Sequence, residues 1–117
     1  MLLALLFKRR FISQIIAGEK TQTRRPTRPQ VKEGATYQLR AGYAPTGHRI
    51  TVEKLFTQKL GEVGPDEAAR EGFSSVEEFA AAWADIYGAW RSDQVVYVVE
   101  FRVETPTETF KEKTGAS

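Results

Sequence analysis

The sequence predicts an α+β fold: a small, mostly antiparallel β-barrel of about five or six strands with two or three short helices. Residues 94–103 form the strongest predicted strand, because they are rich in β-branched and aromatic residues. Residues 35–41 alternate apolar and polar side chains, which is typical of a half-buried strand. Glycine- and proline-containing breaks, rather than regular crossover helices, separate the predicted strands, and this favours antiparallel pairing.

The N-terminal part of the chain is predicted to contain a strand, a helix and a second strand. Residues 2–7 are continuous and apolar, as in a buried strand, and a helix is the alternative for so short a run. Residues 8–17 place four apolar side chains at helical spacing, and Gly18 follows in the position of a C-terminal cap. Residues 20–25 indicate a strand or an extended turn, which Pro26 ends.

The middle of the chain is predicted to be mainly extended. Residues 27–33 are polar and form a loop before the strand at 35–41. We expect a second loop at residues 42–47 and a further strand at 48–58. The apolar residues of this last strand do not alternate strictly, which predicts a bulge near Lys54.

Two helices are predicted in the second half. Residues 65–71 form a short helix that starts at a proline followed by two acids and ends at Gly72. The sequence Ser-Val-Glu-Glu at 75–78 is a capping box, and it opens a helix that continues to Tyr87 and ends at Gly88. The side chains expected to face inward are Val76, Phe79, Ala80, Trp83 and either Ile86 or Tyr87.

The length of 117 residues suits one domain with one modest core. We expect residues 1–104 to form that domain and the polar residues 105–117 to form a flexible C-terminal tail. The absence of cysteine excludes disulfides and thiolate metal sites and fits a cytoplasmic protein. With His48 as the single histidine, we expect no metal site and no cofactor. The apolar residues 1–7 are too short for a membrane span, and no membrane partner is expected.

Charge is distributed unevenly along the chain. Residues 1–32 carry eight Lys/Arg and one acid, a balance of +7. Residues 33–117 carry nine Lys/Arg and fourteen acids, a balance of −5, which leaves the net charge of +2. A basic segment on a near-neutral protein indicates an anionic partner, with nucleic acid or a nucleotide as the first candidate. Scatter of these charges over opposite faces is the alternative.

The densest group of polar residues is Gly-Glu-Lys-Thr-Gln-Thr-Arg-Arg-Pro at 18–26. A functional site and a solvated basic strand both fit this pattern. The spacing Gly18-x-Lys20-x-x-Thr23-x-Arg25, behind a strand and a short helix, resembles the signature of the ASCH domain family. Other segments resemble the family in the same order along the chain, namely 32–34, 71–75, 84–87 and 98–101. The resemblance spans residues 3–104 and implies a PUA-like β-barrel with an RNA-related function.

Thr23 stands where the common family pattern has a glutamate. The Lys-x-x-Thr version is similar to the bacterial ASCH amidohydrolases that remove the acetyl group from N4-acetylcytidine. This resemblance implies catalytic roles for Lys20, Thr23 and Glu71, with a modified nucleoside or RNA as the partner.

Amide hydrolysis needs a nucleophile, a base and a group that serves the leaving nitrogen. Thr23 is the candidate nucleophile, Lys20 the base, and Glu71 either the proton donor or the group that activates water. Lys20 acts as a base only if burial or nearby positive charge lowers its pKa, and a nearby Glu71 opposes this. In a regular strand, residues three apart face opposite sides, so Lys20 and Thr23 meet only if the chain bends after Gly18.

The remaining candidates are expected to bind the substrate or RNA. Arg24, Arg25 and Arg28 supply positive charge, and Tyr43 is a candidate for base stacking. The alternative function is a non-catalytic RNA-binding module or a ribonuclease, although the chain offers no histidine pair for acid–base catalysis. Trp83 is expected in the core.

Overall fold

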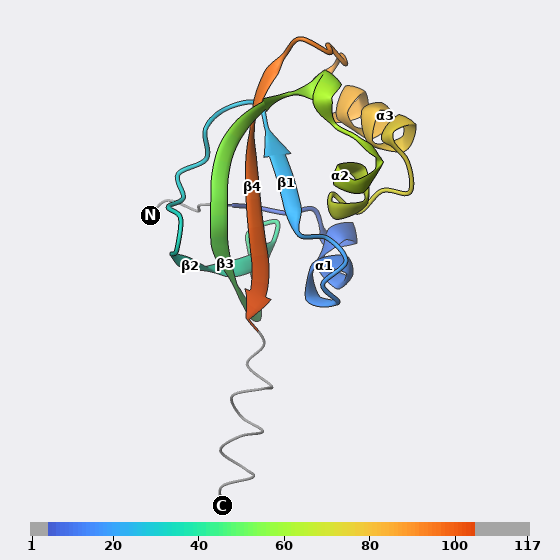
Figure 1. Cartoon of the computed structure of the whole chain (residues 1–117). Coiled ribbons are helices and arrows are strands. Elements are labelled where there is room, and N and C mark those ends of the chain that lie inside the picture. The colour runs from blue at the N-terminus through green and yellow to red at the C-terminus, as the bar shows by residue number, and fades with distance from the viewer. Residues whose placement is uncertain (1–4, 105–117) are drawn as a thin grey trace, which may run out of the picture.

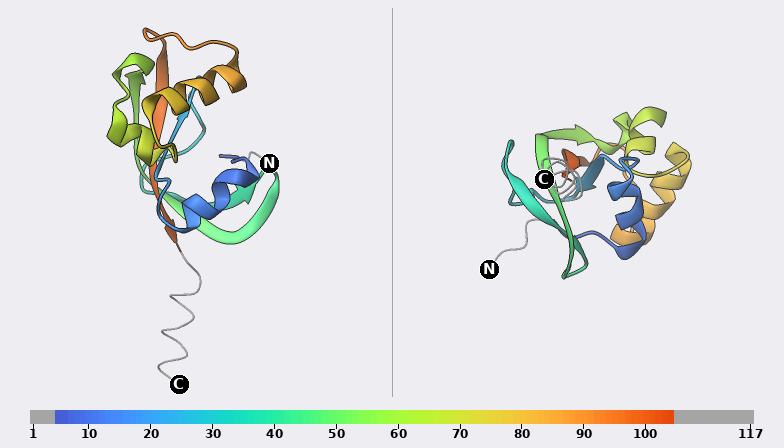
Figure 2. Two further views of the ribbon diagram at one scale, coloured as in Figure 1. Left: turned by 90° about the vertical axis from the view of Figure 1, so that its right-hand side faces the viewer. Right: turned by 90° about the horizontal axis from the view of Figure 1, so that it is seen from below.

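A strongly curved antiparallel sheet is the centre of the computed structural model, which describes residues 5–104 (Figures 1 and 2). Its strands lie in the order β1-β4-β3-β2. They are β1 (Gln22–Arg25), β2 (Thr36–Ala41), β3 (Ala44–Lys59) and β4 (Val95–Glu104). The helices α1 (Arg9–Ile16), α2 (Pro65–Arg70) and α3 (Val76–Tyr87) lie on the β1 side of the sheet. The predicted α+β class with a small, mostly antiparallel barrel is confirmed, since the four strands form a curled half-barrel. The expected tail at 105–117 lies outside the described residues.

The described residues contain four strands rather than five or six, because residues 5–7 of the predicted strand at 2–7 form none: Phe7 makes only an isolated parallel bridge with Ala41. The predicted loop at 42–47 is shorter than expected, and β3 begins at Ala44. Gly42 and Tyr43 alone make the turn, and Gly42 adopts a φ of 61°. The predicted bulge is present, since the register with β4 shifts between Val52 and Lys54.

The predicted signals of α3 are confirmed at both ends. The Ser75 hydroxyl accepts a hydrogen bond from the backbone N–H of Glu78 at 3.0 Å, and Gly88 ends the helix with a φ of 94°. Neither Ile86 nor Tyr87 is buried, and each remains 42% exposed. A 3₁₀ turn, η1 (Leu60–Glu62), that was not predicted connects β3 to α2.

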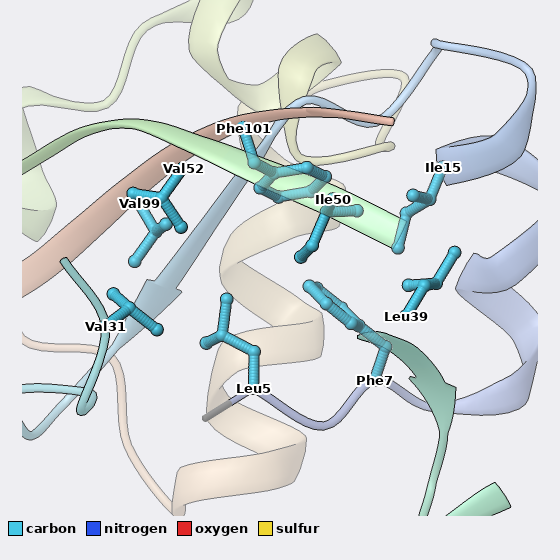
Figure 3. Packing of buried hydrophobic residues seen from close by; sticks show 9 residues of the cluster. All are labelled: Leu5, Phe7, Ile15, Val31, Leu39, Ile50, Val52, Val99 and Phe101. Atoms are coloured by element: carbon cyan, nitrogen blue, oxygen red, sulfur yellow. The ribbon is translucent and has the colours of Figure 1, made fainter. Parts of the chain in front are cut away.

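Two clusters of buried apolar residues form the core. The first lies inside the curl of the sheet, beneath α1, and contains Leu5, Phe7, Ile15, Val31, Leu39, Ile50, Val52, Val99 and Phe101 (Figure 3). The second lies under α2 and α3 and contains Leu60, Val63, Ala68, Phe79, Trp83 and Val96. Among residues 5–104, no helix has the length and apolar character that crossing a membrane requires.

Candidate functional site

Backbone contacts from the end of α1 hold together two segments that are distant in sequence. The carbonyl of Gln14 accepts from the N–H of Lys20 at 3.1 Å, while the Gln14 side-chain amide donates to the carbonyl of Gly72 at 3.1 Å. Position 72 needs glycine, because its φ is 97° and a Cβ there would lie 2.7 Å from the Gln14 Oε1. The N–H of Thr21 also donates to the carbonyl of Arg70 at 2.8 Å. The start of β1 is therefore fixed against the end of α2.

Lys20 is buried and uses its ammonium group entirely within the protein. Its Nζ lies 2.6 Å from the Glu71 carbonyl oxygen, 3.2 Å from Glu71 Oε1 and 3.1 Å from the Gln22 carbonyl oxygen. The same Nζ lies 4.6 Å from the centre of the Phe11 ring. These partners account for the three N–H donors of the charged amine.

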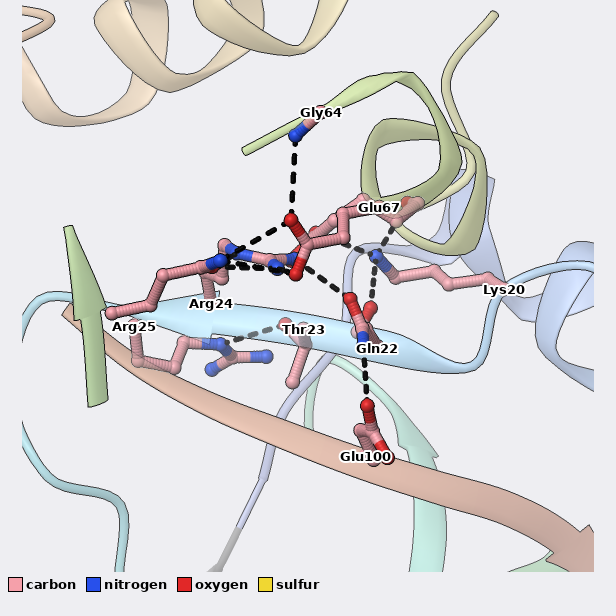
Figure 4. Close-up of polar contacts among 10 residues, drawn as sticks. Lys20, Gln22, Thr23, Arg24, Arg25, Gly64, Glu67 and Glu100 are labelled. Atoms are coloured by element: carbon pink, nitrogen blue, oxygen red, sulfur yellow. Dashed lines mark hydrogen bonds and ion pairs between the residues drawn. The ribbon is translucent and has the colours of Figure 1, made fainter. Parts of the chain in front are cut away.

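Arg24 is the centre of a buried polar network rather than an exposed cation (Figure 4). Its side chain is 0% exposed. One terminal nitrogen donates to Gln22 Oε1 and Glu71 Oε2, each at 3.0 Å, and the other donates to Glu67 Oε2 at 3.1 Å. The Nε and Nη2 atoms both donate to Gln58 Oε1, at 3.1 and 2.9 Å. Five hydrogen bonds match the five N–H donors of the guanidinium, so the network holds Glu71 from the side opposite Lys20.

Thr23 and Arg25 lie together on the other face of β1 (Figure 4). The Nε of Arg25 donates to the Thr23 hydroxyl oxygen at 3.1 Å, and its Nη2 donates to the Leu6 carbonyl at 2.9 Å. The guanidinium also lies over the Phe7 ring, 5.3 Å from its centre. These contacts fix the direction of the Thr23 hydroxyl and leave Nη1 of Arg25 without a hydrogen-bond partner among the described residues.

A cavity of about 140 Å³ joins these groups. Lys20, Thr23, Arg24, Arg25 and Glu71 all line it, although Lys20 and Thr23 share no hydrogen bond. The predicted bend before β1 is present, since Gly18 has a φ of 81°. The remaining walls come from the N-terminal segment, α1, the segment after α2, and α3: Leu6, Phe7, Lys8, Phe11, Phe73, Phe79, Ala82, Trp83, Ile86 and Tyr87.

Two of the candidate binding residues lie away from this cavity. Arg28 is exposed in the segment after β1, and Tyr43 is 74% exposed in the turn between β2 and β3. Neither lines the cavity. Arg28 was predicted to belong to the site because it follows the motif at 18–26 closely in sequence. The strand β1 ends before Pro26, however, and the chain then leaves the cavity.

Burial changes the acid–base properties of two cations at the cavity, Lys20 and Arg25. Burial lowers the pKa of Lys20 below the usual lysine value, and the positive charges of Arg25 and Arg24 act in the same direction. Glu71 opposes this shift but does not cancel it. Burial also lowers the pKa of Arg25, against opposing contributions from Tyr87 and Glu71. A lowered lysine pKa is what a general base near neutral pH requires.

The residues that support the polar groups were not predicted from the sequence. Gln22, Gln58 and Glu67 hold Arg24, and Gln22 also donates to Glu100 at 2.6 Å. The available signal was weak: Gln22 and Arg24 are two apart and therefore share one face of a strand. Glu67 lies in the short helix α2, and nothing in its local pattern connects it to β1.

The aromatic wall was also missed as part of a site. Trp83, which was predicted to be a core residue, is buried and lines the cavity as well. Among the described residues its indole N–H has no hydrogen-bond partner. In residues 5–104, no group of three or more His, Asp or Glu side chains is placed to hold a metal ion.

Comparison with solved structures identifies the fold. The chain superposes on an ASCH domain from Lactobacillus crispatus JV V101 with a TM-score of 0.65, 18% identity, and coverage of 78% of this chain and 68% of that one. A DUF984 protein from Enterococcus faecalis V583 superposes with a TM-score of 0.64 and 18% identity, and the match covers 88% of this chain and 81% of that one. For a point mutant of an ASCH protein from Zymomonas mobilis the TM-score is 0.58 and the identity 16%, and the match covers 84% of this chain and 66% of that one. No protein-family model and no curated protein matches the sequence. The chain therefore has the fold of ASCH domains.

Proposed function

We propose that this chain is an amidohydrolase of the ASCH family that removes the acyl group from N4-acetylcytidine or a related modified nucleoside. The observation that carries the proposal is the meeting of Lys20, Thr23 and Glu71 at one cavity. A concave site with apolar walls, a few convergent polar groups and a shifted pKa is typical of an active site. The aromatic side chains on the cavity wall suit the flat face of a base.

In the proposed reaction, the Thr23 hydroxyl attacks the acyl carbonyl carbon. Its proton passes to the neutral amine of Lys20, then to Glu71, and finally to the departing N4 nitrogen of the cytidine. Cytidine leaves with its amino group restored, and the acyl group remains as an ester on Thr23. Water then attacks this ester, which releases the carboxylic acid and regenerates the hydroxyl.

Two features of the resting site bear on this mechanism. Arg25 donates to the Thr23 oxygen, and this contact stabilises negative charge as it develops there. Lys20 donates to Gln22 and Glu71 but not to Thr23, so the mechanism requires its amine to turn toward the hydroxyl when the substrate binds.

The direct test is release of acetate and cytidine from N4-acetylcytidine, followed by chromatography from about pH 6 to pH 9. We expect Lys20→Met and Thr23→Val to lower kcat/KM by roughly 10²- to 10⁴-fold. Thr57→Val is the matched control, since Thr57 is an exposed threonine of β3 and does not line the cavity. The absence of acetate at every pH would refute the proposal.

The second candidate is an RNA-binding module without catalysis. It is favoured by the exposed cations Lys8, Arg9 and Arg10 beside the cavity. The contacts of Arg24 argue against this candidate. Arg24 was expected to contact RNA, but its five N–H donors are all used inside the protein. Salt-dependent binding of unmodified RNA without turnover of acetylcytidine would favour this candidate.

A further inference from the structure

Three consecutive cations lie at the start of α1, beside the cavity. Lys8, Arg9 and Arg10 are all exposed. Lys8 lines the cavity itself. Arg10 lines a neighbouring groove of about 400 Å³ that shares Phe11, Phe73 and Ala82 with the cavity. The cations therefore extend from the cavity into an adjoining open space.

The positive charge of this cluster is not balanced within the described part of the protein. Lys8, Arg9 and Arg10 form no ion pair there. The three cations lie at the N-terminus of α1, which is the positive end of the helix dipole. The first turn of α1 contains no acid that could offset this charge. The groove contains one carboxylate, Glu78, which accepts a hydrogen bond from the N–H of Ser74. Glu71, the acid of the cavity, pairs with Lys20 and Arg24, so Lys8 and Arg10 face only Glu78 and an excess of positive charge remains.

Phe11 connects this cluster to the proposed reaction centre. The guanidinium carbon of Arg10 lies 4.7 Å from the centre of the Phe11 ring, and the Nζ of Lys20 lies 4.6 Å from the same centre. A group bound by Lys8 and Arg10 would thus be separated from Lys20 by about one aromatic side chain.

We propose that Lys8 and Arg10 bind a phosphate attached to the ribose of the substrate, so that the preferred substrate is a phosphate ester of an acylated cytidine rather than the free nucleoside. The identity of the base in this inference rests on the proposed function. A phosphate is the charged group that a nucleoside gains at its ribose, and flexible cations at the rim of a base-sized cavity are suited to it. Both a mononucleotide and an RNA strand carry a phosphate on the ribose, so either could bind here.

The experiment compares four substrates: N4-acetylcytidine, its 5′- and 3′-monophosphates, and a short single-stranded RNA with one internal N4-acetylcytidine. We expect kcat/KM for at least one phosphorylated substrate to exceed that for the nucleoside by about tenfold, as one good charged contact gives. Preference for a monophosphate identifies a nucleotide, and preference for the oligonucleotide identifies RNA. Equal kcat/KM for all four would overturn the inference.

Variants locate the effect. Lys8→Gln combined with Arg10→Gln is expected to remove the preference for phosphorylated substrates, so that kcat/KM for these substrates falls to the value that the same variant shows for the nucleoside. Arg49→Gln is the matched control, because Arg49 is exposed on β3 and lines neither space. A preference that survives the double substitution would overturn the assignment to these residues.

Binding of the products separates this inference from the proposed function. Calorimetry with cytidine and with its 5′- and 3′-monophosphates requires no turnover. Tighter binding of a monophosphate that is lost in the double variant supports the phosphate site, even if no substrate is deacetylated and the proposed function fails. Equal binding of cytidine and both monophosphates, together with equal turnover of the nucleoside and phosphorylated substrates, would refute the phosphate site while the proposed function stands.

Discussion

Lys20 contacts Glu71 through both the main chain and the side chain, although the residues are 51 positions apart. The shorter of the two contacts, 2.6 Å, is to the carbonyl oxygen. Because that contact does not depend on the side chain, a substitution at position 71 removes the carboxylate while a strong hydrogen bond still holds the amine. Position and charge can therefore be tested separately at this site.

The first prediction concerns catalysis by Glu71. Glu71→Gln is expected to lower kcat/KM on acetylcytidine by roughly 10²- to 10⁴-fold, because an amide cannot carry the proton to the leaving nitrogen. Glu67→Gln serves as the control, since Glu67 also bonds Arg24 but does not line the cavity. Activity of Glu71→Gln within a few-fold of wild type would exclude Glu71 from the proton path.

The second prediction concerns stability. Glu71→Gln is expected to lower the free energy of unfolding by about 3–5 kcal/mol, because Lys20 then remains buried without a carboxylate and Arg24 keeps only Glu67. Urea unfolding of the two proteins measures this difference. Glu53→Gln breaks the exposed pair with Arg102 and is expected to change stability by less than about 1 kcal/mol. Similar losses for the two variants would contradict the buried network.

The third prediction follows from the lowered pKa of Lys20. In the folded protein this pKa lies below the usual value of 10.5, so in the interval between them the unfolded chain binds more protons at Lys20 than the folded chain does. Raising the pH through that interval should therefore stabilise wild type relative to Lys20→Met, and the advantage should be lost as the pH falls through the folded pKa. Urea unfolding of both proteins at several pH values checks the sign, and parallel curves would refute it.

The same shift predicts a pH dependence of activity. The neutral amine of Lys20 accumulates as the pH rises through its lowered pKa, so kcat/KM on the uncharged nucleoside should rise with pH below the usual lysine value. The residual activity of Lys20→Met should lack this rise. A wild-type profile that shows no rise with pH anywhere below the usual lysine value would remove Lys20 from the role of base.

The fourth prediction assigns Arg24 to positioning. Arg24→Lys replaces five N–H donors in a fixed plane with three, so it should both destabilise the fold and lower kcat without a matching change in KM. Arg28→Lys is the control at an exposed arginine and should change neither quantity. An effect of Arg24→Lys confined to KM would instead support direct substrate contact.

The fifth prediction tests the capping of α3. Ser75→Ala is expected to cost about 1 kcal/mol, because the backbone N–H of Glu78 loses its acceptor. Ser13→Ala, at an exposed position inside α1, should be close to neutral. Thermal unfolding of the two variants provides the comparison.

Local patterns in the sequence predicted most of the elements but not all of their lengths. The capping box at Ser75 and the β-branched run that became β4 act through neighbouring residues, and so they can be read without the tertiary structure. The start of β3 could not be predicted in this way, because Pro45 is typical of a loop, yet here it pairs with Arg40 of β2.

The candidate site shows the same limit. The spacing of Lys20 and Thr23 is local and was visible, and the resemblance pointed to Glu71. Gln58 and Glu67 became visible only when the fold placed β3 and α2 beside β1. Arg24 was predicted to bind substrate. Its burial could not be foreseen from the local sequence, because the partners that bury it lie 34 to 47 positions away.

Different elements of the fold supply the charged groups and the apolar wall of the cavity, and this has a consequence for how the cavity can change in evolution. Hydrogen bonds from α1, β1, β3 and α2 hold Lys20, Arg24 and Glu71, and the described contacts of this network include none from α3. The α3 helix instead supplies apolar wall residues such as Ala82 and Tyr87. The size and shape of the accepted molecule can therefore drift through changes in one twelve-residue helix while the charged groups keep their arrangement. Under the proposed function, substitutions in α3 would change which substrates fit, while the groups that carry the reaction keep their positions.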